Sequence, residues 1–236
     1  MKPIVILRFA RTEGPGYFAT YLDGRGLSWR LVKLDEGEVL PAFGGFSGLA
    51  MMGGPMSVND DLPWIPPVLE LARASVANDV PVIGHCLGGQ LLSKALGGRV
   101  TRNAVKEIGW GEVQVAATAE AREWGPAKPF LSYHWHGETF SIPPAAERIW
   151  GSAHCANQGF VVGNSIGMQC HVEMTEDLIE TWCETGAREI EEALPLSPAV
   201  QTPEQMRVDI AARVDALHRA AHKVYDRWVS GLEVNP

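Results

Sequence analysis

The sequence predicts an α/β fold with a mainly parallel open sheet and helices on both faces. Short, nearly continuous apolar runs, of the kind that form strands buried on both faces, alternate with segments of helical periodicity. Strand–helix alternation of this kind favours a parallel sheet flanked by helices. The expected strands are Ile4–Phe9, Arg30–Leu34, Gly48–Met52 and Val80–Gly84, and the expected helices between and after them are Tyr17–Asp23, Trp64–Ala77 and Leu87–Leu96.

The middle of the chain has few helix signals. Residues 106–115 and 132–162 are expected to form strands and loops. Phe160–Val162 and Ile166–Cys170 are separated by Gly163, Asn164 and Ser165, a short polar connection that indicates a β-hairpin.

Two helices are expected to follow, Glu176–Leu194 and Pro203–Gly231. Thr202 is the expected N-cap of the second helix, with Pro203 at its first position and Gln205 as capping-box partner. Its apolar residues recur every three or four positions and predict one stripe that packs on the body of the same domain. The stripe consists of Met206, Ile210, Val214, Leu217, Ala221, Val224 and Trp228. The predicted organisation is therefore a main domain over residues 1–194 and a C-terminal helical extension over residues 195–236, packed on that domain.

Composition narrows the functional class. The chain has 236 residues, is 46% hydrophobic and carries a formal net charge of −8. An acidic surface disfavours nucleic acid and anionic membranes as partners, because both need clustered Lys and Arg. No run of about 18 apolar residues predicts a membrane span, and the apolar stretch Ile4–Leu7 is too short for a signal peptide.

The four cysteines, Cys86, Cys155, Cys170 and Cys183, form no CxxC pair and no disulfide-like framework. So few cysteines in a chain of this size fit the reducing cytoplasm. Three of them together with His171 match no standard zinc spacing, so no metal is expected.

The sharpest motif runs from Pro81 to Gln90, with the sequence PVIGHCLGGQ. An apolar strand enters Gly-x-Cys-x-Gly and a helix follows, which is the cysteine form of a nucleophile elbow. Cys86 is then at a helix N-terminus, which favours the thiolate, and the backbone N–H of Leu87 is free to bind an oxyanion. Taken alone, the motif favours a functional Cys86 but leaves open that this residue is a small buried apolar side chain at a strand end.

A second motif is Gln169-Cys170-His171-Val172-Glu173. A thiolate nucleophile needs a base that later acts as an acid, and histidine is the usual choice. In an extended segment, residues two apart face the same side, so Glu173 can orient His171. A third segment, Met51–Ser57, contains Gly53-Gly54-Pro55 directly after a predicted strand, at the sheet edge where α/β proteins bind ligands. Taken alone, this last segment would be a plain turn.

These three motifs, in this order, resemble the triad-type class I glutamine amidotransferases, including the glutaminase domain of GMP synthase and stand-alone relatives. The resemblance covers residues 4–190 and implies the flavodoxin-like fold of that family. Tyr133–Phe140 and Ile108-Gly109-Trp110 are similar to further family elements.

The resemblance implies Cys86 as nucleophile, His171 as general base and acid, and Glu173 as the orienting carboxylate. It assigns the oxyanion hole to the N–H groups of Gly54 and Leu87. The implied substrate-binding residues are Gly53, Gln90, Trp135, His136 and Gly137.

The chain departs from the family pattern at His85, where an aliphatic residue is usual, at Cys170, which replaces a frequent Phe, and at Val172, which replaces a frequent Pro. None of these changes removes a catalytic atom. His85 either tunes the thiol or faces into the sheet packing, and we favour the packing.

The implied reaction is hydrolysis of the side-chain amide of L-glutamine through a cysteinyl thioester, with no cofactor, supplying ammonia to an acceptor. The chain lacks a P-loop and a pyrophosphatase-type Ser-Gly-Gly-x-Asp-Ser loop, so a separate synthetase or acceptor enzyme is a candidate partner. The alternatives are a γ-glutamyl peptide hydrolase or other Cys-His hydrolase on the same fold, and a non-catalytic regulatory homologue.

Overall fold

The computed structural model describes residues 2–232 and contains one nine-stranded sheet. Its spatial order is β2-β1-β3-β4-β9-β8-β7-β5-β6. The strands are β1 (Ile4–Arg8), β2 (Trp29–Lys33), β3 (Gly48–Met51), β4 (Val82–His85), β5 (Val100–Val115), β6 (Phe130–Phe140), β7 (Glu147–Ser152), β8 (Gly159–Val162) and β9 (Ser165–Met168). The neighbouring strands β2, β1, β3, β4 and β9 are parallel to one another, and the other strand pairs of the sheet are antiparallel. The predicted fold class is confirmed.

Helices cover both faces of the parallel part, and each face has its own core. Successive residues of a strand point to opposite faces, and in β1 the side chains of Ile4 and Ile6 enter one core while those of Val5 and Leu7 enter the other. The first core includes residues of α1 (Gly16–Gly24), and the second includes residues of α2 (Ile65–Ala77) and α3 (Leu87–Ala95). The apolar strands predicted from sequence are therefore buried on both faces.

The antiparallel part differs from the sequence-based expectation in two places. β5 begins at Val100, six residues before the predicted segment, and its register against β6 shifts between Arg102 and Glu107. Such an irregularity interrupts the alternation of apolar and polar residues on which the prediction relied. The short helix α4 (Ala119–Trp124), capped by the Thr118 side chain, was also not predicted. The predicted hairpin is confirmed as β8 and β9.

Each of the two long helices expected near the C-terminus is in fact two helices, so both predictions are corrected. The first divides into α5 (Glu176–Thr185) and α6 (Ala187–Ala193) at Gly186. A Cβ atom at Gly186 would lie 2.3 Å from the Trp135 ring, so close packing requires glycine there. The second divides into α7 (Pro203–Arg207) and α8 (Ile210–Ser230), because Asp209 adopts a left-handed φ of 51°. The predicted capping box of Thr202 and Gln205 is present.

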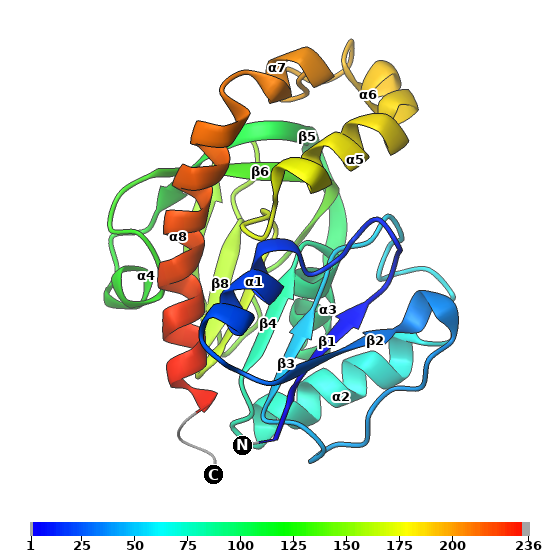
Figure 1. Cartoon of the computed structure of the whole chain (residues 1–236), viewed down its shortest axis with the longest axis vertical. Coiled ribbons are helices and arrows are strands. Elements are labelled where there is room, and N and C mark those ends of the chain that lie inside the picture. The colour runs from blue at the N-terminus through cyan, green and yellow to red at the C-terminus, as the bar shows by residue number, and fades with distance from the viewer. Residues whose placement is uncertain (1, 233–236) are drawn as a thin grey trace.

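The apolar stripe of the last helices is buried in the core that also contains β1 and α1. Figure 1 shows α8, in red, running past α1 on one side and α4 on the other, and residues of α8 contact both helices. Met1, in the predicted main domain, and residues 233–236, in the predicted C-terminal extension, lie outside the residues that the structure describes. Within residues 2–232, no helix is long and apolar enough to span a membrane.

Candidate active site

Cys86 occupies a strained position between β4 and α3. Its φ is 49° and its ψ is −105°, a conformation that non-glycine residues rarely adopt and that typically marks functional sites. The flanking glycines make this turn possible. A Cβ atom at Gly88 would lie 2.0 Å from the Met51 carbonyl oxygen, and one at Gly84 would lie 2.4 Å from the backbone of Gly88. The sharp strand-to-helix turn predicted from the sequence is therefore present.

The sulfur of Cys86 lies among polar groups from other segments of the chain. Its thiol donates to the carbonyl oxygen of Trp135, with Sγ 3.8 Å from that oxygen, and the side-chain amide of Gln169 donates to Sγ over 3.5 Å. Gln169 is itself held by the amide of Gln90, whose Nε2 lies 3.1 Å from Gln169 Oε1. Gln90 thus contacts the thiol through Gln169, a buried residue that the sequence analysis did not select.

His171 follows β9 and is anchored by its backbone, because its N–H donates to the Tyr133 carbonyl oxygen over 2.8 Å. Its side-chain Nδ1 lies 2.6 Å from Glu173 Oε1. Its other nitrogen, Nε2, is buried and has no hydrogen-bond partner in residues 2–232. The ring packs edge-on against Trp182, with 4.8 Å between centroids. His171 is therefore held at Nδ1 and free at Nε2, which is the arrangement a proton-transfer group needs.

Charge interactions favour an ionised His171–Glu173 pair. Although burial opposes the charge on His171, the negative charges of the Glu173 carboxylate and of Cys86 in its thiolate form raise the pKa of His171 well above the ordinary range. Burial likewise favours the neutral form of Glu173, but His171 and then His85 lower the pKa of this carboxyl. Both shifts stabilise an imidazolium next to a carboxylate.

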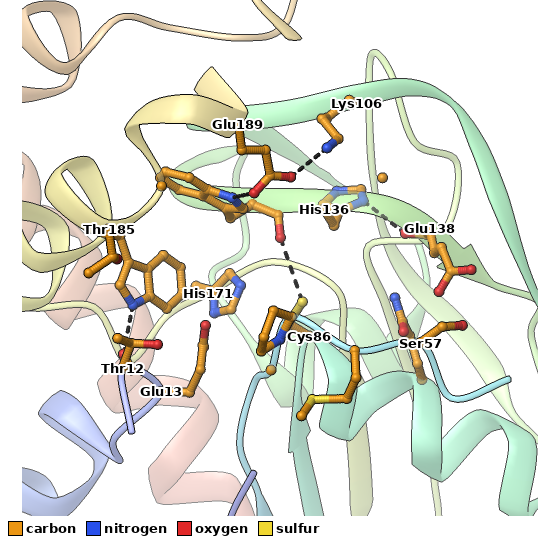
Figure 2. A pocket seen from close by; sticks show the side chains of 18 residues that line it. Thr12, Glu13, Ser57, Cys86, Lys106, His136, Glu138, His171, Thr185 and Glu189 are labelled. Atoms are coloured by element: carbon orange, nitrogen blue, oxygen red, sulfur yellow. Dashed lines mark hydrogen bonds and ion pairs between the residues drawn. The ribbon is translucent and has the colours of Figure 1, made fainter. Parts of the chain in front are cut away.

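Cys86 and His171 line one cavity of about 460 Å³, and Figure 2 shows their side chains facing it. Of the residues expected to bind substrate, four line the cavity: Gln90, Trp135, His136 and Gly137. Gly53 lies just behind the wall, since a Cβ atom there would be 3.3 Å from His171 Cε1. The structure thus brings together residues from four separate segments of the sequence.

Gly54 and Leu87, the expected oxyanion-binding residues, are neighbours. A Cβ atom on Gly54 would lie 2.7 Å from Leu87 Cδ2. Gly54 lines the cavity, and Leu87 is the first residue of α3, directly after Cys86. Among the hydrogen bonds of residues 2–232, none uses the backbone N–H of either residue, so both donors are free for a ligand.

Several further polar residues of the cavity wall were not expected from the sequence: Thr12, Glu13, Ser57, Lys106 and Glu189. In Figure 2 the carboxyl of Glu13 points toward His171. Burial raises the pKa of Glu13 to about 7, and the neighbouring Glu173 adds to this shift while His171 opposes it. Glu13 belongs to a loop without periodicity or motif, so only its position next to a glycine-rich turn could have suggested it.

The Trp135 segment is held by side chains of α5 and α6 that also line the cavity. Glu189 accepts a hydrogen bond from the Trp135 indole N–H over 2.9 Å and also pairs with Lys106. The Trp135 ring meets the Trp182 ring edge-on at 5.7 Å. These contacts hold the carbonyl group that faces Cys86.

His85 packs behind Glu173. Its Nε2 lies 3.3 Å from the Tyr225 hydroxyl and 3.9 Å from Glu173 Oε2, and its ring lies 5.9 Å from that of Phe18. Burial lowers the pKa of His85, an effect that Glu173 partly opposes. Through Tyr225, α8 contacts the residues that surround the His171–Glu173 pair.

Comparison with known proteins gives a consistent family assignment. Residues 18–181 match the family model described as glutamine amidotransferase class-I. A crystal structure of a glutamine amido transferase from Methylobacillus flagellatus superposes with a TM-score of 0.96 and is 45% identical, over 98% of this chain and 95% of that one.

Curated proteins show the same similarity. The glutamine amidotransferase-like protein YfeJ of Salmonella typhimurium is 28% identical over 77% of this chain and 80% of its own length. A GMP synthase (glutamine-hydrolyzing) of Thermomicrobium roseum is 34% identical over 54% of this chain. That match spans only 23% of the GMP synthase.

Proposed function

The chain belongs to the class I glutamine amidotransferase family, and on that premise we propose that it hydrolyses the side-chain amide of L-glutamine with a Cys86–His171–Glu173 triad. One observation carries the proposal. A cysteine with a strained φ of 49° shares a cavity with a histidine whose Nδ1 lies 2.6 Å from a buried carboxylate. This arrangement supplies a nucleophile, a proton carrier and an orienting group.

The first step forms the thioester. In the reactive form the proton of Cys86 already resides on His171 Nε2, which makes His171 an imidazolium, and the Cys86 thiolate attacks the side-chain amide carbon of glutamine. The carbonyl oxygen becomes an oxyanion, which the N–H groups of Gly54 and Leu87 stabilise by about 3–4 kcal/mol each. The imidazolium of His171 then protonates the amide nitrogen, the C–N bond breaks, and ammonia leaves.

The second step regenerates the enzyme. Neutral His171 accepts a proton from a water molecule, which attacks the carbonyl carbon of the γ-glutamyl thioester. When the tetrahedral intermediate collapses, the C–S bond breaks, glutamate leaves, and Cys86 is released as the thiolate next to the protonated His171, which restores the starting ion pair. Glu173 keeps the proton of His171 Nδ1 in place in both steps, so that Nε2 is the atom that exchanges protons.

The cavity wall supports an amino-acid substrate. Trp135, His136 and Gly137 line the cavity beside the thiol, with Gln90 on α3, and we assign the amino-acid end of glutamine to this region. Charged groups of both signs, Glu13, Lys106 and Glu189, also line the cavity. They fit a substrate that carries both an ammonium and a carboxylate group.

The ammonia acceptor is proposed to belong to a separate synthetase or acceptor enzyme, since the sequence has no nucleotide-binding motif of its own. Unpaired cysteines at all four positions also support the expectation of a reducing compartment such as the cytoplasm. We expect the isolated chain to hydrolyse glutamine slowly and a partner to raise the rate.

The test is a glutaminase assay on the purified chain, with and without candidate acceptors, and with Cys86→Ala as the blank. Slow, Cys86-dependent release of ammonia is expected. Turnover of about 10 per second without any acceptor or partner enzyme would contradict the expectation that a partner raises the rate. Hydrolysis of γ-glutamyl peptides but not of glutamine would instead identify a peptide hydrolase, and no Cys86-dependent activity on either would identify a regulatory homologue.

A further inference from the structure

A cluster of one carboxylate and two imidazoles lies beside the substrate cavity, apart from the triad. It consists of Glu107 on β5 and of His134 and His136 on β6, all three buried, and one donor atom from each lies within 4.8 Å of the others. Strand register brings them together, because Glu107 pairs directly with His136. His134, two residues along β6, faces the same side of the sheet. The residue opposite His134 on β5 is Gly109. Because Gly109 has no side chain, nothing at that position separates His134 from Glu107.

The hydrogen bonds of His136 determine which of its nitrogens carries a proton. Its Nδ1 lies 3.0 Å from the Glu138 carbonyl oxygen, which can only accept, so Nδ1 must be the donor. In the neutral ring, Nε2 then carries a lone pair, and it lies 3.0 Å from Glu107 Oε2. Two lone pairs at this distance repel each other unless a cation, either a proton or a metal ion, lies between them.

His134 presents a third lone pair. Its Nε2 lies 3.4 Å from the Gly111 carbonyl oxygen, to which it can only donate. The Cδ2–Nε2 edge of the ring faces Gly111, because a Cβ atom at that glycine would lie 2.9 and 3.0 Å from these two atoms. Nδ1 is on the opposite edge, and it is buried without a hydrogen-bond partner in residues 2–232. A second proton on His136 would satisfy Glu107 but leave this nitrogen unpaired, whereas a metal ion could take one donor atom from each of the three residues.

Further contacts hold the carboxylate of Glu107 in place. Ser152 Oγ donates to Oε1 over 2.9 Å, and Gln158 Nε2 donates to Oε2 over 2.8 Å. Metal-binding carboxylates and histidines usually have such outer partners, and a histidine ligand usually donates its second N–H to a carbonyl or carboxylate, as both histidines do here. The cluster therefore has outer contacts as well as inner donors.

The cluster also has access to solvent. A second cavity, of about 340 Å³, is lined by Glu107, His134, Ser152 and His154, whereas His136 lines the substrate cavity. The three donors thus lie between the two cavities. Room remains at the second cavity for a water molecule as a fourth ligand.

We propose that Glu107, His134 and His136 bind a divalent first-row transition metal, with Zn²⁺ as the first candidate. Two imidazoles, one carboxylate and one water form a donor set that zinc accepts in a four-coordinate site. The ion would join β5 to β6 and fix His136, which is part of the substrate-cavity wall. It takes no part in the hydrolytic steps described above. Neither Glu107 nor His134 was expected to bind a metal, because the sequence-based candidates contained cysteine and these two residues are far apart in the chain.

The experiment measures metal binding rather than activity. The protein carries Cys86→Ala, because Cys86 and His171 are themselves zinc donors, and it is tag-free and stripped with chelator. Calorimetric titration with Zn²⁺, together with metal analysis after dialysis, is expected to give one equivalent per chain and a raised Tm. Adding His134→Gln should weaken binding about 100-fold or more, since even outer partners contribute 10- to 100-fold. The matched control His222→Gln, at an exposed histidine on α8, should leave binding unchanged.

A spectroscopic measurement keeps the proposal falsifiable even if His134→Gln does not fold. Co²⁺ bound to the Cys86→Ala protein should show the visible d–d bands of a four- or five-coordinate site with nitrogen and oxygen ligands, and no thiolate charge-transfer band. The proposal is overturned by an absence of stoichiometric binding, by equal binding in folded His134→Gln, or by a thiolate band. The first of these results would mean that a proton alone joins Glu107 and His136.

Discussion

His171 Nδ1 lies 2.6 Å from Glu173 Oε1, and both side chains are almost completely buried. The pair is formed by residues two apart in the chain, so a single extended segment positions both. Around it pack His85, from the residue directly before the proposed nucleophile, and Tyr225, from α8. The C-terminal helix is therefore part of the environment of the site.

Replacing Cys86 by alanine should lower the rate of glutamine hydrolysis roughly a thousandfold or more, without unfolding the chain. The reason is that no thioester can form without the sulfur. An electrophilic glutamine analogue should label Cys86 in the wild-type protein, as mass spectrometry can verify. Cys155→Ala serves as the matched control and should remain active, and a label on any other cysteine would argue against the elbow as the reactive site.

Glu173→Gln should lower kcat by about 10²–10⁴-fold with little change in KM. The amide can still contact Nδ1, but it stabilises the imidazolium less and permits the wrong tautomer. Steady-state kinetics and circular dichroism on the same preparation separate this effect from misfolding. Unchanged kcat in a folded variant would show that Glu173 is purely structural.

The same pair should stabilise the protein most within a defined pH window. The pKa of Glu173 lies below its ordinary 4.5, so its contribution is present above that pH and is lost as pH falls through the lower folded value. The pKa of His171 lies well above 6.5, so its contribution is present below pH 6.5 and is lost as pH rises through the higher folded value. Urea denaturation should therefore show the largest difference in unfolding free energy between wild type and Glu173→Gln between these two pH values. A difference that does not vary with pH would contradict the ionised pair.

Glu13→Gln should change both the pH profile of activity and the pH dependence of stability. Because its pKa is raised to about 7, Glu13 gains a negative charge next to His171 near neutral pH. The stability that it contributes is present below its ordinary pKa of 4.5 and is lost as pH rises through about 7, so the variant should gain in stability relative to wild type over that interval. The log kcat/KM profile should lose one titration near pH 7.

The control for this prediction is Glu70→Gln, at an exposed glutamate on α2. It should leave both pH profiles as they are in wild type. Identical profiles for Glu13→Gln and wild type would mean that Glu13 does not titrate in this range.

Gly88→Ala should lower the free energy of unfolding by about 3 kcal/mol or more, because losses of this size come from steric clashes and defects in the core. The new Cβ atom would lie 2.0 Å from the Met51 carbonyl oxygen, which is backbone and has little freedom to move. Gly24→Ala, at the end of α1 where a Cβ atom has no neighbour within 4 Å, is the matched control. Chemical denaturation should show a loss only for Gly88→Ala, and equal stability of the two variants would mean that the elbow can relax.

Local sequence was enough to predict the features formed by residues close together in the chain. The elbow at Cys86, the His171-x-Glu173 pair, the β8–β9 hairpin and the capping box at Thr202 each depend on a few consecutive residues. Turn geometry, strand alternation and helix capping are all short-range effects. The alternating apolar strands and helices likewise predicted the fold class, because burial on both faces leaves a continuous apolar run.

Other features depend on contacts between residues far apart, and no local pattern indicates them. Gly186, directly after α5, lies against the Trp135 ring, which occupies the space of a side chain. Glu13 lies near His171 because the segment after β1 is held against the segment after β9, where the Tyr17 N–H donates to the Glu173 carbonyl oxygen. Glu107 meets His136 across 29 positions through the register of β5 on β6. Such register is set by the burial of whole strands, so a short sequence window does not contain the information that joins these side chains.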